Sequence, residues 1–204
     1  AVGWLTLLGG LAILAPILPI PDPTKDAKIV LGGQGPSLSH LFGLDASGRD
    51  LLSRIIWGAR TSLFIAFVAI AAGFLVGGAL GILAGYFRGR IGGFIGAVLD
   101  ILLAFPQLIL ALAIVTFLGR SIANVTFALA IVSTPVLARI ARASTLSWSE
   151  REFVVAARAQ GAKHLRVMGR EVFPNVLPAM FSIALLGVAV VIVAEAGLAI
   201  IGAG

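Results

Sequence analysis

Long apolar runs separated by short polar segments make up most of this chain of 204 residues. A helix needs about twenty apolar residues to cross ~30 Å of hydrocarbon. Five runs reach or approach that length, and we expect each to form a membrane helix. They lie at roughly 3–20, 61–86, 94–118, 122–139 and 176–201. The pattern therefore predicts an all-α fold, a polytopic transmembrane helical bundle in which residues 1–204 form a single domain.

The first apolar run resembles the hydrophobic part of a secretory signal peptide, but no charged segment precedes it. Pro16 and Pro19 end the run. A first membrane helix whose start is cut short is the better interpretation. Because the chain opens at Ala1 without a methionine and stops at Gly204, we expect a piece of a longer protein.

The polar segment at 21–60 is predicted to be a loop, because Gly, Pro and Asp are frequent in it. Its last part has a different pattern. Ser47 is placed like an N-cap, and the apolar residues Leu51 and Ile55 follow at a helical spacing. We expect a short interfacial helix there, leading into the second membrane helix.

The polar segment at 148–178 is predicted to contain two short helices. Acidic residues open the first, which suits the positive end of the helix macrodipole, and Gly161 can end it in the left-handed conformation. The second covers 163–172 and is expected to end at Pro174. Small alanines line one face, so the segment could enter a groove in a partner as a knob. An ordinary solvated loop is the alternative.

Charge sets the expected orientation of these segments. Residues 21–60 carry a net charge of +1, residues 86–90 one of +2 and residues 139–171 one of +4. Five alternating membrane helices put the two more basic segments on the same face, and cytoplasmic loops carry the excess of Lys and Arg. The helical segment at 140–175 is therefore expected in the cytoplasm, and the loop at 21–60 outside it.

Composition agrees with a membrane protein and excludes other classes. The chain is 59% hydrophobic and 12% charged, with a mean hydropathy of +1.09, far outside the range of soluble domains. Its net charge of +6 would suit a nucleic-acid partner, but no soluble basic domain is present to bind one. Without cysteine the chain has no disulfide, thiolate metal site or cysteine nucleophile.

Sequence motifs of enzymes are missing as well. The chain contains no Gly-x4-Gly-Lys-Ser/Thr loop for ATP, no HExxH and no catalytic triad pattern. His40 and His164 fall in loops expected on opposite faces, so they cannot share a metal. We expect no catalytic, cofactor-binding or metal site in this chain, and therefore no enzyme activity of its own.

A ladder of glycines runs along the second apolar run. Its members are four residues apart, so they share one stripe of a helix: Gly73, Gly77, Gly81 and Gly85. Small residues let a second helix approach closely where lipid gives no hydrophobic drive for association. We expect a tight seam, either within the bundle or against another subunit. The alternative is that glycine is simply frequent in membrane helices.

Few ionisable or helix-breaking residues lie inside the apolar runs. Asp100 and Glu195 are the acids nearest the membrane, and we interpret them as buried polar anchors bonded to neighbouring helices rather than as a proton relay. Pro106, which follows Phe105, should kink the third membrane helix. Such a kink can line a pathway or serve packing alone. An ion- or proton-coupled carrier of small solutes is therefore the weaker functional hypothesis.

The 148–178 segment resembles the cytoplasmic signature of the inner-membrane permease subunits of bacterial ABC importers. That signature, often called the EAA motif, reads Glu-Ala-Ala, three residues, Gly, nine residues, Ile, one residue, Leu-Pro. Ala156, Ala157, Gly161 and Pro174 fall at the matching places. The chain departs from the pattern at three positions. These hold Val155 for Glu, Glu171 for Ile and Phe173 for Leu.

Other segments resemble the dipeptide, oligopeptide and nickel branch of that family, in particular its second, C-type permease subunit. They cover nearly the whole chain and lie at 42–45, 48–54, 58–63, 84–87, 100–106, 174–178, 194–198 and 201–202. The resemblance implies the type I importer permease fold, a sixth membrane helix missing here, and a location in the inner membrane. It also implies a heterodimer with a homologous permease, two ATPase subunits that bind ATP and Mg, and an extracytoplasmic substrate-binding protein.

Under this resemblance the 150–174 loop is the coupling element that docks into the ATPase. Its expected contact residues are Glu152, Ala156, Ala157, Arg158, Gly161, Lys163, Arg166 and Pro174. The expected function is a permease subunit of an ATP-driven importer of di- or oligopeptides, although no residue identifies the cargo. The alternatives are the ion-coupled carrier and a membrane scaffold without transport.

Overall fold

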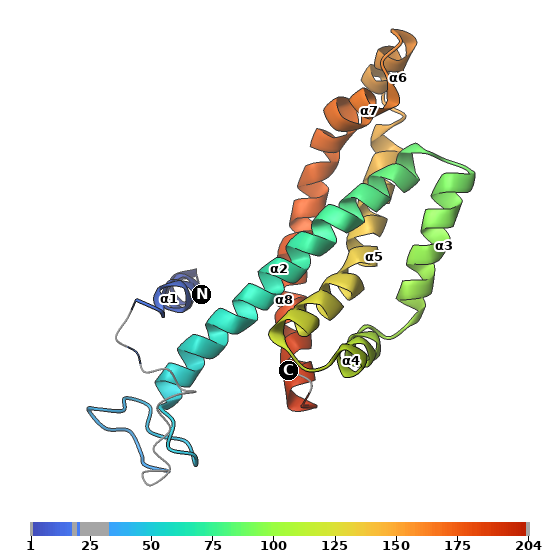
Figure 1. Ribbon diagram of the computed structural model, residues 1–204. Coiled ribbons are helices and arrows are strands. Elements are labelled where there is room, and N and C mark those ends of the chain that lie inside the picture. The colour runs from blue at the N-terminus through green and yellow to red at the C-terminus, as the bar shows by residue number, and fades with distance from the viewer. Residues whose placement is uncertain (1, 18–19, 21–32, 203–204) are drawn as a thin grey trace. The chain divides into compact units, whose positions relative to one another are not determined.

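The computed structural model describes residues 2–17, 20 and 33–202, and within them it contains helices and no named strand. The elements in chain order are α1 (Val2–Leu14), α2 (Leu51–Tyr86), α3 (Arg90–Ala104), α4 (Gln107–Leu118), α5 (Ile122–Trp148), α6 (Glu152–Ala159), α7 (His164–Arg166), the π-helix η2 (Val167–Val172) and α8 (Phe173–Ile200). The prediction of an all-α fold is confirmed for this part of the chain (Figure 1). The chain divides into two compact units, Ala1–Phe64 and Ile65–Gly204.

In the first unit, α1 is shorter than the membrane helix predicted at 3–20. It has 13 residues and ends at Leu14. Residues 18 and 19 of the predicted span lie outside the described part of the chain. Proline disfavours helical backbone at the residue before it, which is Ala15 here, and it cannot donate a helical hydrogen bond itself. By length alone, α1 falls below the ~20 residues that a span needs.

The loop that precedes α2 is held by two aspartates. Asp45 accepts hydrogen bonds from the backbone amides of Ser47 (2.8 Å) and Arg49 (2.9 Å), and from the Arg54 guanidinium (2.6 Å). These bonds favour the ionised carboxylate: with the Arg49 amide as the largest cause, they hold the pKa of Asp45 below its usual range.

Asp50, rather than the predicted Ser47, caps α2. Its carboxylate accepts a hydrogen bond from the Ser53 amide at 2.8 Å, and its other oxygen lies 2.9 Å from His40 Nδ1. The helix then runs without a break for 36 residues. The residues expected to form a separate interfacial helix are therefore the first turns of α2, because the cap lies at Asp50 and no glycine or proline interrupts the following residues before Gly58.

In the second unit, α5 is the helix against which α3, α4 and α8 pack (Figure 1). Its buried side chains include Val125, Leu129, Val132 and Leu137, which join one apolar core. Ser121 caps it by accepting a hydrogen bond from the Asn124 amide at 3.1 Å. The position of α5 therefore determines where the other helices of this unit lie.

Within the described residues, three helical stretches are long and apolar enough to cross a membrane: α2, α5 and the run His164–Ile200. A fourth candidate is the pair α3 and α4, which are bent by 89° at Phe105–Pro106. The predicted kink at Pro106 is thus a complete break, since Phe105 has extended backbone (φ −86°, ψ 138°) as the residue before a proline tends to have. Of the five predicted membrane helices, four correspond to these stretches.

The predicted end, at Pro174, of the second short helix in the 148–178 segment is wrong. Helical structure continues from His164 to Ile200 through η2 and α8, with Pro174 in the first turn of α8. The π-helical register explains this continuity, because the Phe173 amide bonds to the Met168 carbonyl five residues back. The Asn175 side chain supplies a further bond, from Nδ2 to the Glu171 carbonyl at 2.7 Å.

The glycine ladder of α2 faces α5. A methyl group added at Gly77 would lie 2.5 Å from the Thr134 carbonyl oxygen, and one at Gly85 would lie 2.7 Å from Thr145 Cβ. At Gly81 it would meet the Ala138 carbonyl and lie 2.6 Å from Ala141 Cβ. Gly73 is less tight, with 3.2 Å to Leu137 Cδ1. The seam is therefore within this chain, and the two backbones approach too closely for any side chain at its centre.

We predict that Gly81→Ala destabilises the second unit by about 1–3 kcal/mol, the usual cost of overpacking. The measurement is an SDS-titration unfolding curve in mixed micelles. Gly93→Ala is the control, because a methyl group there would meet nothing within 4 Å apart from its chain neighbours and the backbone of its own helix. Equal stability of the two variants would contradict the tight seam.

A second prediction concerns the loop at 33–50. The depressed pKa of Asp45 means that its stabilising bonds are fully present above the usual aspartate pKa of about 3.9 and are lost as the pH falls through the lower, folded value. In protein labelled with ¹⁵N-serine, the Ser47 amide resonance should shift with a midpoint below about 3.9. The shift should be absent in Asp45→Asn. A midpoint at or above the ordinary value would contradict these bonds.

Candidate functional site

The strongest candidate site is the helical projection formed by residues 149–166, which we call the platform. It contains α6 and α7 and lies at one end of the second unit (Figure 1). It leaves α5 at Trp148 and returns through η2 into α8. Two of the long helices therefore connect to it directly.

The start of the platform differs in detail from the sequence prediction. Glu152 lies in the first turn of α6, where an acid was expected, with extended Arg151 before it. Glu150 is outside the helix and forms an exposed ion pair with Arg88 at 2.7 Å. Arg151 also places its guanidinium 5.3 Å from the centre of the Trp148 ring.

Gly161 ends α6 as predicted. It has a positive φ of 79°, which L side chains rarely adopt. The Ala162 amide donates to the Ala157 carbonyl (3.1 Å) and the Gly161 amide to the Arg158 carbonyl (2.9 Å), the two bonds of a Schellman motif. The chain thus turns sharply between α6 and α7.

The inner side of the platform is anchored in a second apolar core. Val154 of α6 is fully buried there, together with Val167, Met168 and Val172 of η2. Ile82 and Tyr86 of α2 belong to the same cluster. The platform is therefore a packed extension of the bundle, not an ordinary solvated loop.

Its outer side exposes apolar and basic side chains together. Leu165 is 81% exposed and Val155 53%, and neither was singled out as a contact residue from the sequence. The predicted contact residues on this exposed surface are Glu152, Ala156, Arg158, Gly161, Lys163 and Arg166, whereas Ala157 is half-buried and Pro174 lies beyond it in α8. The sequence does not indicate that Leu165 is exposed, because a single leucine among basic residues is typical of the buried position of an amphipathic helix.

Arg158 has an internal contact as well as an exposed position. Its guanidinium carbon lies 4.7 Å from the centre of the Tyr86 ring, within cation–π range. The sequence gives no sign of this contact, since the two residues are 72 positions apart.

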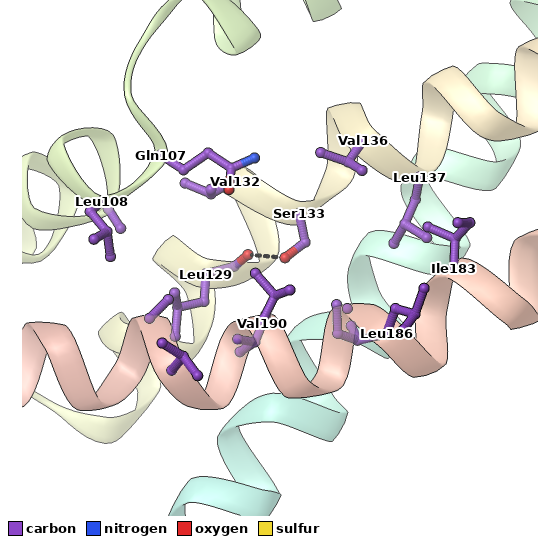
Figure 2. Close-up of a pocket in the computed structure, with 16 residues that line it drawn as sticks. Gln107, Leu108, Leu129, Val132, Ser133, Val136, Leu137, Ile183, Leu186 and Val190 are labelled. Carbon is purple, nitrogen blue, oxygen red and sulfur yellow. Dashed lines mark hydrogen bonds between the residues drawn. The ribbon is translucent and has the colours of Figure 1, made fainter.

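A second candidate site is an apolar groove in the second unit, with a volume of about 510 Å³ (Figure 2). Side chains of α4, α5 and α8 line it, joined by Ile70 of α2. Its polar side chains are Gln107 and Ser133, and the Ser133 hydroxyl donates to the Leu129 carbonyl at 2.7 Å. Such a lining favours contact with an apolar surface rather than with a polar ligand. The described residues contain no cluster of three His, Cys, Asp or Glu side chains that could bind a metal ion.

The acids near the membrane lie apart from each other. Asp100 of α3 forms an ion pair with Arg139 of α5 at 2.7 Å, with both side chains nearly two-thirds exposed. It is thus bonded to a neighbouring helix, as expected, but it is not buried. Glu195 is half-buried in α8, and it interacts with another group rather than being unpaired. Phe105, at the α3–α4 break, is exposed.

Comparison with known proteins places this architecture in a family. The family model of the binding-protein-dependent transport system inner membrane component matches residues 77–204. Among solved structures, the chain is similar to a MetNI methionine ABC transporter in an inward-facing conformation (TM-score 0.64, 22% identity, 71% of this chain and 72% of that one). An amino acid ABC transporter is also similar (TM-score 0.54, 21% identity, 69% and 68%). At such identities these structures support the fold alone.

Curated relatives are more similar in sequence. The dipeptide transport system permease protein DppC of Alkalihalophilus pseudofirmus is 42% identical over 171 residues, covering 84% of this chain and 56% of that protein. The DppC of Haemophilus influenzae is 35% identical and covers 95% and 68%. The glutathione transport system permease protein GsiD of Pectobacterium atrosepticum is 35% identical and covers 84% and 57%.

The chain thus spans little more than half the length of the first of these relatives. The family match nevertheless covers all of α3 to α8, including the platform, and these relatives confirm the resemblance to the dipeptide and oligopeptide branch of ABC importer permeases. The chain belongs to the family of binding-protein-dependent transport system inner membrane components.

Proposed function

We propose that the chain is a permease subunit of an ATP-driven importer and that the platform docks into an ATPase subunit. The observation that carries this proposal is the platform itself, which is anchored by Val154 and exposes Leu165 and Val155. Exposed apolar residues on a rigid, polar-rimmed projection mark a protein interface. The sequence of 204 residues has no phosphate-binding loop for ATP, so under this proposal ATP is bound by a partner.

The platform then faces the cytoplasm, and the loop before α2 faces outside. Support comes from the basic residues of 139–171, which outnumber the acids by seven to three. ATP and Mg are held by two ATPase subunits and not by this chain. The partner across the membrane path is a homologous permease, and an extracytoplasmic substrate-binding protein delivers the cargo.

Peptides are the proposed cargo. The relatives are named for dipeptides and glutathione, both small peptides with charged termini. The apolar groove of Figure 2 supplies surface for a neighbouring helix rather than for such a polar solute. We therefore place the peptide path between this chain and its partner.

The direct test is uptake of a radiolabelled dipeptide into proteoliposomes that contain the full-length permease, its partner permease, the ATPase subunits and the substrate-binding protein. Uptake that requires ATP supports the proposal. Uptake that follows a proton gradient without ATP would instead support the ion-coupled carrier, and the absence of any uptake would support a scaffold role.

Docking through Leu165 gives a sharper prediction. Leu165→Asp places a charge in an apolar interface and should weaken ATPase binding by at least about tenfold, as loss of an interface anchor does. Leu165→Met keeps the apolar surface and should bind normally. Binding is measured by titrating purified ATPase subunit onto the permease complex in nanodiscs. Equal affinity of the two variants would exclude Leu165 from the interface.

A further prediction concerns the turn at Gly161. Gly161→Val forces a β-branched residue into left-handed backbone, at a cost of about 1–2 kcal/mol or more. We expect ATP-dependent uptake and stimulated ATPase activity to fall several-fold, while membrane insertion is unchanged. Gly161→Asn, which tolerates this conformation, should retain most activity. Normal transport by Gly161→Val would show that the turn is not needed for coupling.

A further inference from the structure

Tyr86 is the last residue of α2, and its side chain links that helix to both halves of the platform. The residue is only 8% exposed. Its hydroxyl lies 3.1 Å from His164 Nδ1, so the two side chains share a hydrogen bond. The guanidinium of Arg158 covers its ring at 4.7 Å. One aromatic side chain thus contacts α6 on one side of the Gly161 turn and α7 on the other.

This contact matters because α2 is not adjacent to the platform in sequence. The platform is joined covalently to α5 and, through η2, to α8. A displacement of α6 and α7 therefore moves α5 and α8 directly. It reaches α2 either indirectly, through the glycine seam with α5, or directly, through side chains that contact the platform.

Other contacts of α2 or of the residues just after it differ from this one, including the ring contact of Phe87 with His164 at 5.6 Å. The glycine seam joins α2 to α5, and Ile82 joins the core beneath the platform. The nearby Arg88–Glu150 pair is more than half exposed on both sides, where an ion pair contributes little. Tyr86 is buried and contacts α6 and α7 at once.

We propose that Tyr86 is a positioning residue that carries displacement of the platform to α2, so that its loss uncouples ATP hydrolysis from transport without preventing ATPase docking. The inference rests on the proposed function, because it assumes an ATPase that moves the platform. Tyr86 is buried whereas Leu165 is exposed, so Tyr86 is not itself part of the docking surface, although Arg158 connects the two.

The test compares Tyr86→Leu and Tyr86→Phe with wild type in the complete transporter reconstituted in proteoliposomes. The quantity measured is ATP hydrolysed per dipeptide imported. Tyr86→Leu loses both the hydrogen bond and the cation–π contact, and should raise this ratio about fivefold or more. Tyr86→Phe keeps the ring under Arg158 and should raise it about twofold. Arg158→Gln should raise it as well, and less than additively with Tyr86→Leu, provided that its ATPase binding, measured in parallel because Arg158 is exposed on the docking face, is unchanged.

Phe74→Leu is the matched control. Phe74 lies on the same helix and also packs against the core beneath the platform, but its ring contact of 5.0 Å is with Phe181 of α8, outside the platform. Its ratio should stay within about twofold of wild type. If Phe74→Leu and Tyr86→Leu raise the ratio equally, the effect is general loss of α2 packing and the proposal is wrong.

ATPase binding separates this inference from the proposed function. Wild type that binds no ATPase, or that imports without ATP, overturns the function and with it the inference. If the wild type imports the dipeptide with ATP and Tyr86→Leu hydrolyses the same amount of ATP per dipeptide, the inference alone is wrong. A Tyr86→Leu variant that cannot bind ATPase places the residue in docking and also overturns it. Tyr86→Phe, which preserves the packed ring, decides the matter if Tyr86→Leu does not fold.

Discussion

The close approach of α2 and α5 along four glycines is the interaction on which the second unit depends. In a bilayer the backbone hydrogen bonds of each helix are formed within that helix. Lipid provides no hydrophobic driving force that would hold separate helices together. Close packing has to do so instead, and a methyl group at Gly77 or Gly81 would meet backbone atoms of α5. Since α3, α4 and α8 all pack on α5, the seam fixes the bundle to which the platform is attached.

The platform is stiff for reasons that follow from the same bundle. It begins where α5 ends and continues through η2 into a helical run that reaches Ile200, without a break at Pro174. Val154 packs into the second apolar core and so anchors the platform, and the Schellman motif at Gly161 fixes the turn between α6 and α7. A displacement of its outer face is therefore transmitted to the long helices α5 and α8, because no flexible loop lies between them and the platform. Tyr86 extends that connection to α2, the helix that the chain does not join to the platform.

Much of this architecture could be predicted from the sequence, because membrane helices appear as long apolar runs and the glycines repeat every four residues. The turn at Gly161 could be predicted too, since a glycine after a small-faced helix is a strong stop signal. Features that depend on neighbours could not. Pro106 breaks its helix whereas Pro174 does not, and the difference lies in a π-helical register before Pro174 that no local signal reveals. Pairs distant in sequence, such as Asp100 with Arg139, and the exposure of Leu165 likewise required the fold.

The central claim is that the outer face of the platform docks into an ATPase. The most direct measurement is photo-crosslinking from residue 165 after Leu165→p-benzoylphenylalanine substitution in the full-length permease, in native membranes, with the products identified by mass spectrometry. The account predicts a crosslink to a peptide of the ATPase subunit, near an apolar groove on its surface. Crosslinks only to lipid, to the substrate-binding protein or to the permease itself would contradict it.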